Sequence, residues 1–199
     1  MRFLFKLIIC ALLATATGLA ISAARSGDPV YTVYEWISPA RFQQYDAVIR
    51  RVSAEHKLDP MLVKAVVWRE SRFDPRKIGT AGERGLMQVT EVAATDWARE
   101  NHIDNFRVEE LFDPKTNLDV GTWYLRRAFE RWAGQSDPTP FALAEYNAGA
   151  SRAQRWAGGA DAGALHEKTF RANIDFPRTR AYVESIIARR NFYKRRGRM

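Results

Sequence analysis

Apolar residues recur at helical intervals over most of this chain, and three proline pairs mark where helices begin. Each pair places a side-chain oxygen at the N-cap and a proline at the first helical position, where the missing N–H costs nothing. Helical spacing without a convincing run of alternating strands predicts a mainly α fold. The three pairs are Asp59-Pro60, Asp113-Pro114 and Thr139-Pro140.

The same spacing predicts where other helices lie. One helix is expected to end near Lys57, and the last helix is expected to start at about Arg178. Residues 76–84 are rich in glycine and polar side chains, which is typical of a loop or a short hairpin. The predicted class is therefore mainly α, with a small β excursion possible near residues 76–84. That excursion would make the fold α+β.

Length and composition exclude several classes of protein. With 199 residues, 46% of them hydrophobic and 27% charged, the chain is typical of one globular domain rather than of a disordered chain. Cys10 is the single cysteine, so an internal disulfide and a cysteine-based zinc site are excluded. The histidines, His56, His102 and His166, have no metal-ligand spacing. We therefore predict no metal site and no cofactor.

The first residues are typical of an export segment. Arg2 and Lys6 precede an uncharged run from residue 7 to residue 24, which ends in small residues that suit a signal peptidase. The run is also close to the minimum length of a membrane-spanning helix. As a cleaved signal peptide or as a retained anchor, the segment would carry the rest of the chain into the periplasm. The predicted organisation is an export segment over 1–24, a linker over 25–38 and one domain over 39–199.

Glu70 is the most informative single residue. It follows Val63, Val66 and Val67 at the spacing i, i+3, i+4, i+7, which places a carboxylate on the apolar face of a helix. Burial raises the pKa of a carboxylate, and a raised pKa suits a general acid at neutral pH. A buried glutamate in a structural ion pair with an arginine fits the same spacing, so both interpretations stay open at this point.

Four short motifs occur in a fixed order along the chain, and the first of them contains this glutamate. They are Glu70-Ser71, Gly85-Leu86-Met87-Gln88, Ala144-Glu145-Tyr146-Asn147-Ala148-Gly149 and Thr179-Arg180-Ala181-Tyr182-Val183. Together they resemble the lytic transglycosylase domain of the soluble-lytic-transglycosylase (SLT) type, which has a lysozyme-like fold. The resemblance covers roughly residues 45–190, and the chain departs from the family pattern mainly in loops, as at Glu83 and Arg178.

The resemblance implies cleavage of the β-1,4 bond between N-acetylmuramic acid and N-acetylglucosamine in peptidoglycan. A single glutamate, Glu70, would protonate the leaving oxygen and then act as a base on the C6 hydroxyl, which closes a 1,6-anhydromuramyl ring. The resemblance also implies substrate-binding roles for six residues. They are Ser71 at the acetamido group, Met87 as an apolar wall, Gln88, Tyr146 and Asn147 along the sugar, and Tyr182 beside the glutamate.

Two alternatives stay open at this stage. Glu83 and Asp74 lie in the loop beside the expected cleft, and a second carboxylate about 5–9 Å from Glu70 would allow hydrolysis by water, as in a lysozyme-type muramidase. The other alternative is a peptidoglycan-binding module without activity. The intact Glu70-Ser71 pair argues against that module.

The net charge of +8 agrees with an anionic envelope as the surroundings. Removal of residues 1–24 takes away two positive charges and no acid, which leaves +6. Six of the ten residues from 189 to 198 are basic, which fits either a solvated helix end or attraction to anionic lipid or cell wall. The expected partners are glycan strands, the inner membrane and a recruiting envelope complex. Nucleic acid is not expected as a partner of an exported chain.

Overall fold

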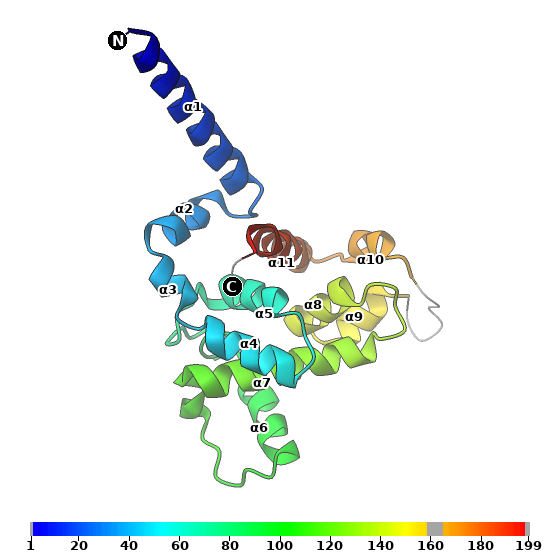
Figure 1. Ribbon diagram of the computed structural model, residues 1–199. Coiled ribbons are helices and arrows are strands. Elements are labelled where there is room, and N and C mark those ends of the chain that lie inside the picture. Colours follow the sequence, from blue (N-terminus) through cyan, green and yellow to red (C-terminus); the bar gives the residue numbers. More distant parts are fainter. Residues whose placement is uncertain (1, 159–164, 198–199) are drawn as a thin grey trace.

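The computed structural model describes residues 2–158 and 165–197, and over these residues the mainly α fold is confirmed (Figure 1). A single 3₁₀ turn, η1, accompanies the α-helices. The elements are α1 Arg2–Ala24, α2 Pro29–Ile37, α3 Pro39–Gln43, α4 Asp46–Glu55, α5 Pro60–Ser71, α6 Glu91–Glu100, η1 Val108–Phe112, α7 Pro114–Arg131, α8 Thr139–Ala148, α9 Ala150–Trp156, α10 Glu167–Asn173 and α11 Pro177–Arg196.

Helix α5 is the central element of the bundle. It packs between α4 and α11, and α11 also packs on α8 (Figure 1). A helix with neighbours on several sides needs apolar residues around most of its circumference. The sequence of α5 meets this need, because Leu62, Val63, Val66, Val67 and Trp68 are all at most 2% exposed.

Two of the three predicted helix starts form as expected. The carboxylate of Asp59 accepts a hydrogen bond from the N–H of Met61, and that of Asp113 accepts one from Thr116. The third prediction was wrong in detail. Helix α8 already includes Thr139, its N-cap is Pro138, and no side chain caps it. The carboxylate of Asp137 instead accepts from the N–H of Thr139, so the turn before the helix satisfies that donor.

Two other segments differ in local detail from simple periodicity. The helical spacing that ends near Lys57 is divided between α3 and α4, with a break after Gln44, so two short helices stand where one was expected. The expected β excursion is limited to two isolated antiparallel bridges, which pair Arg84 with Ile78 and with Val89.

The N-terminal part contains more structure than a linker. Helix α1 projects away from the bundle, and residues Phe5–Ala24 are long and apolar enough to cross a membrane (Figure 1). Residues 25–38, expected to be a linker, contain α2, whose Thr32 and Glu35 side chains are buried. This segment therefore packs on the bundle instead of merely leading into it.

Candidate active site

Glu70 lies in the last turn of α5, and the end of that helix is held by contacts from α2. Arg72, the C-cap, adopts a left-handed backbone conformation with φ of 56°. Its guanidinium forms a salt bridge of 2.9 Å with Asp28 and stacks 4.0 Å from the centre of the Trp68 ring. Tyr31 donates a hydrogen bond to the carbonyl of Arg72. These contacts fix the position of the last turn of α5, which carries Glu70.

The carboxylate of Glu70 is tuned toward neutrality. Burial is the largest effect and raises the pKa of Glu70 to about 7, and the negative charge of Glu83 acts in the same direction. A hydrogen bond from Tyr182 opposes this shift, as do the charges of Lys77 and Arg69. The Tyr182 hydroxyl donates to Oε1 of Glu70 at 2.5 Å. Since burial raises the pKa of Tyr182 well above 10, that hydroxyl keeps its proton at neutral pH.

A polar cavity of about 410 Å³ opens in front of Glu70. The loop after α5, the turn that carries Gln88 and the end of α8 all contribute to its lining. The cavity has the size and mixed lining expected of a small-ligand site. Its lining residues are Glu70, Lys77, Ile78, Gly79, Thr80, Glu83, Gln88, Thr90, Tyr146 and Asn147.

The turn that carries Gln88 is built on one buried asparagine. Asn117 accepts a hydrogen bond from the N–H of Met87 and donates to the carbonyls of Arg84 and Leu111, each at 2.8 Å. Gly85, with φ of 75°, lies so close that a Cβ there would meet Asn117 at 2.3 Å. The close approach of Gly85 to Asn117 therefore requires glycine, which accounts for the first residue of the Gly-Leu-Met-Gln motif.

Comparison with known proteins identifies the family of this chain. The model of the transglycosylase SLT domain family matches residues 47–168. The chain belongs to the SLT transglycosylase domain family. It is 28% identical over 151 residues to the soluble lytic murein transglycosylase of Escherichia coli K12, which covers 75% of this chain and 23% of that protein. It is 32% identical over 112 residues to the membrane-bound lytic murein transglycosylase F of Desulfosudis oleivorans, with 55% and 23% covered.

The fold of the SLT domain agrees with a solved structure. The 70 kDa soluble lytic transglycosylase of Escherichia coli superposes with a TM-score of 0.69 at 28% identity, and the match covers 77% of this chain and 24% of that one. The matched part of this chain therefore spans about a quarter of the length of each of these three relatives.

Five of the residues predicted for the SLT site come together at or beside the cavity. Gln88, Tyr146 and Asn147 line it together with Glu70, and Tyr182 contacts the glutamate from α11. The hydroxyl of Tyr146 donates to the carbonyl of Met87 at 2.9 Å, which ties α8 to the turn that carries Gln88. The exposed Asn147 accepts a hydrogen bond from Thr179, which ties α8 to the start of α11.

Ser71 and Met87, also predicted for the SLT site, neither line the cavity nor hydrogen-bond to the carboxylate of Glu70. Ser71 is 3% exposed, and its hydroxyl donates back to the carbonyl of Val67 within α5. Met87 is fully buried against Gly121, where a Cβ would meet its side chain at 2.6 Å. In the structure, Ser71 completes the end of α5, and Met87 supports the turn below Gln88.

The two carboxylates considered as second acids are placed differently. Glu83 lines the cavity with Glu70, and its Oε2 accepts a hydrogen bond from the N–H of Ala81. Asp74 is absent from the residues that line the cavity, and its Oδ1 accepts from the N–H of Arg76 in the turn after α5. Over residues 2–158 and 165–197, no three His, Cys, Asp or Glu side chains converge on a position for a metal ion.

Sequence reasoning missed two residues that shape the site. Lys77 lines the cavity, and its ammonium donates to the carbonyl of Glu70. Arg72 holds the end of α5 through Asp28, and its role depends on a segment outside the matched SLT region. The Gly-rich loop gave no signal for Lys77. Arg72 directly follows Glu70-Ser71, at the point where the helix must end, and that place was its only signal in the sequence.

Proposed function

We propose that this chain is a peptidoglycan lytic transglycosylase that uses Glu70 as both general acid and general base. The observation that carries the proposal is the pKa of about 7 at a carboxyl that lines an open polar cavity. At neutral pH such a group is present in both its acid and its base form. Membership of the SLT family and the murein transglycosylase names of the relatives support the substrate class.

In the first step the protonated Glu70 donates to the glycosidic oxygen, and the bond from that oxygen to C1 of the muramyl residue breaks. Tyr182 donates a hydrogen bond to Oε1, which leaves Oε2 to carry the proton. Asn147 and Gln88 line the cavity where the acetamido and hydroxyl groups of the sugars would lie. The acetamido group of the substrate stabilises the positive charge at C1.

In the second step the Glu70 carboxylate takes the proton of the C6 hydroxyl, and the O6–C1 bond forms. The carboxyl ends protonated again, so one group completes the cycle and no water is consumed. Tyr182 stabilises the charged form of Glu70 between the steps, because its hydrogen bond lowers the pKa of the glutamate. We assign supporting roles to Ser71 and Met87, which hold the helix end and the turn below Gln88.

Hydrolysis by water is the second candidate, because Glu83 shares the cavity with Glu70. A carboxylate in that place could activate a water molecule on the opposite side of the sugar from the acid. The two reactions leave different products from the same bond: an anhydromuramyl end or a reducing end.

The deciding experiment is digestion of purified peptidoglycan followed by mass spectrometry of the muropeptides. We expect anhydromuropeptides from the parent chain, none from Glu70→Gln, and parental amounts from the control Glu184→Gln, an exposed glutamate on α11. Reducing ends in place of anhydro ends would establish hydrolysis. Binding to peptidoglycan without any product would establish a binding module.

We further propose that the SLT domain acts in the periplasm, brought there by α1 as a signal segment or an anchor. The apolar span Phe5–Ala24 supports this location, as do the basic residues Arg2 and Lys6 at its start. A recruiting envelope complex is tested by affinity purification of the Glu70→Gln chain from membranes. Repeated purifications that yield no reproducible partner would contradict that part of the proposal.

A further inference from the structure

Helix α2 carries an apolar stripe that faces away from the protein. Val30, Val33, Tyr34 and Ile37 stand at i, i+3, i+4, i+7, and they are 66%, 42%, 57% and 72% exposed. This is the spacing of the buried face of an amphipathic helix, here presented to the outside. Four neighbouring apolar side chains on one short helix are more than the scattered single exposures that are normal at a protein surface.

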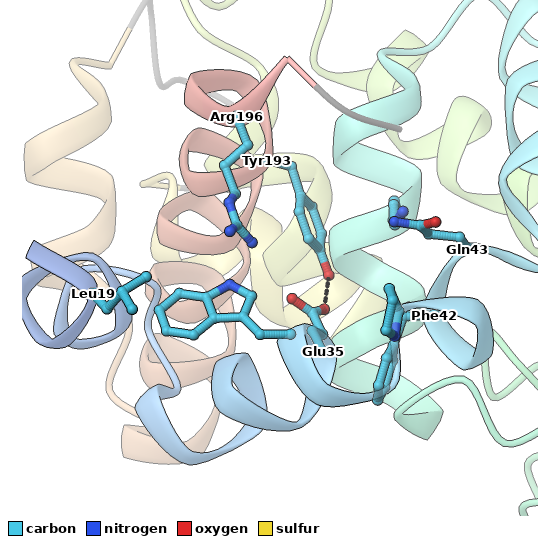
Figure 2. A pocket seen from close by; sticks show the side chains of 9 residues that line it. Leu19, Glu35, Phe42, Gln43, Tyr193 and Arg196 are labelled. Carbon is cyan, nitrogen blue, oxygen red and sulfur yellow. Dashed lines mark hydrogen bonds between the residues drawn. The ribbon is translucent and has the colours of Figure 1, made fainter. Parts of the chain in front are cut away.

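The opposite face of α2 is polar and is fixed to the bundle. Glu35 accepts hydrogen bonds from Arg189 at 3.1 Å and from Tyr193 at 2.7 Å, both on α11. Figure 2 shows Glu35 pointing from α2 toward Tyr193, with Arg196 beyond it. Arg189 is fully buried, so rotation of α2 to hide its stripe would leave an unpaired buried charge. The apolar stripe is therefore held outward by the packing of the bundle.

The stripe lies directly beside the helix that can cross a membrane. The span Phe5–Ala24 is about 30 Å long at 1.5 Å per residue, which matches the hydrocarbon thickness of a bilayer. Helix α2 begins at Pro29 and lies at the base of α1 (Figure 1). The connection is tied down, because Ser26 donates to the carbonyl of Ala23 and Thr32 donates to Ser26, each at 2.6 Å.

Three exposed cations lie near α2. Within residues 2–158 and 165–197, Arg25, Arg41 and Arg196 are exposed and have no carboxylate within 4.0 Å. Arg25 directly follows α1, Arg41 lines a small cavity with Tyr34, and Arg196 stacks 5.2 Å from the Trp36 ring. The acids of α2 and its cap are already paired within the protein, so the local charge left for a partner is positive.

We propose that α2 is an interfacial membrane helix that lies on the bilayer entered by α1. Val30, Val33, Tyr34 and Ile37 enter the boundary between headgroups and acyl chains, and the three arginines bind the phosphates of anionic phospholipids. An amphipathic helix with aromatic residues and flanking cations is the kind of segment that binds in this zone. This surface is distinct from the cavity at Glu70. The proposed membrane contact holds whichever reaction that cavity performs.

The test measures how deep single residues of the full chain lie in a membrane. Cys10→Ser removes the single cysteine, and Ile37→Cys then takes a nitroxide spin label at a 72% exposed site. The matched control is Val92→Cys on α6, which is 73% exposed and far from α1 (Figure 1). Both chains are placed in vesicles of phosphatidylglycerol and phosphatidylethanolamine, and collisions with oxygen and with a water-soluble nickel chelate are compared.

We expect the ratio of oxygen to nickel collisions to be several-fold higher at residue 37 than at residue 92. Equal ratios at the two sites would overturn the proposal. Protection from both reagents at residue 37, with spin–spin broadening, would also overturn it, because a second copy would then cover the stripe. In vesicles of phosphatidylcholine alone we expect a smaller ratio at residue 37, and an unchanged ratio would refute the role of Arg25, Arg41 and Arg196.

Discussion

A pKa of about 7 at Glu70 has a measurable cost for the stability of the fold. The ordinary value for a glutamate is 4.5, so the folded protein binds a proton more tightly than the unfolded chain does. Below pH 4.5 the carboxyl is neutral in both states and there is no penalty. As the pH rises from 4.5 through 7, the unfolded state loses its proton first, and the stability of the fold decreases.

The size of this penalty follows from the two pKa values. The difference between about 7 and 4.5 is about 2.5, and each pKa unit corresponds to about 1.4 kcal/mol, so the full penalty above pH 7 is roughly 3 kcal/mol. Substitution of Glu70 by glutamine keeps the shape and the acceptor for Tyr182 but removes the titration. We therefore expect Glu70→Gln to be more stable than the parent by up to roughly 3 kcal/mol at pH 8, and to be about equal at pH 4.

The measurement is denaturant unfolding of the full chain in detergent at pH 4, 6 and 8, for the parent, Glu70→Gln and the exposed control Glu184→Gln. In thermal unfolding, a domain of this size should show a midpoint for Glu70→Gln that is several degrees higher than that of the parent at pH 8. A stability difference between Glu70→Gln and the parent that does not change with pH would refute the raised pKa and, with it, the acid–base role. Glu184→Gln should show no such trend.

Three further substitutions test the neighbours of Glu70. Tyr182→Phe removes a hydrogen bond that lowers the pKa of Glu70, so the alkaline limb of the pH–rate profile should move to higher pH while the rate falls. A limb that stays in place when muropeptide release is measured would contradict this. Glu83→Gln removes a charge that raises the pKa of Glu70, so the alkaline limb should move to lower pH while anhydro products are still formed. Loss of all product would instead make Glu83 a second catalytic carboxylate. Asn117→Ala removes three hydrogen bonds below the cavity and should cost about 3 kcal/mol in denaturant unfolding, whereas a cost below about 0.5 kcal/mol would show that water replaces them.

Helical periodicity predicted the parts of the site that depend on one helix. Glu70 lies where its spacing from Val63, Val66 and Val67 placed it, because a period of 3.6 fixes the face of each residue. Tyr182 is 112 residues further along the chain, and no local spacing joins the two. Its place beside Glu70 was expected only from the resemblance of ordered motifs.

The N-terminal segment shows what the sequence could not indicate. Residues 25–38 were expected to be a linker that leads into the domain. Glu35 lies on the inner face of α2 and forms a salt bridge with Arg189. Arg189 belongs to the basic run of residues 189–198, which suggested a solvated helix end. The spacing argument used for Glu70 would have found Arg189, since it follows Tyr182 and Ile186 at i+7 and i+3 on a buried face. Arg198, the last cation of that run, lies outside the described residues.

Helix α11 connects the candidate active site with the membrane-facing surface. It runs antiparallel to α5, because Tyr182 near its start contacts Glu70 at the end of α5, while Arg190 and Lys194 near its end bind Asp59 at the start of α5. Its other face carries Arg189, which pairs with Glu35 of α2 and stacks 4.2 Å from the Trp68 ring of α5.

The pair of Arg189 and Glu35 is too deeply buried to separate at low cost, so α2 and α11 move together. Helix α5 joins this unit through the stacking of Arg189 on Trp68 and the contacts of Asp59 with α11. A membrane contact that fixes α2 also fixes the height and direction of the cavity above the bilayer. The connection between α1 and α2 is short and is tied by the hydrogen bond from Thr32 to Ser26. We therefore predict that a chain anchored by α1 acts only on glycan strands that pass close to the membrane surface.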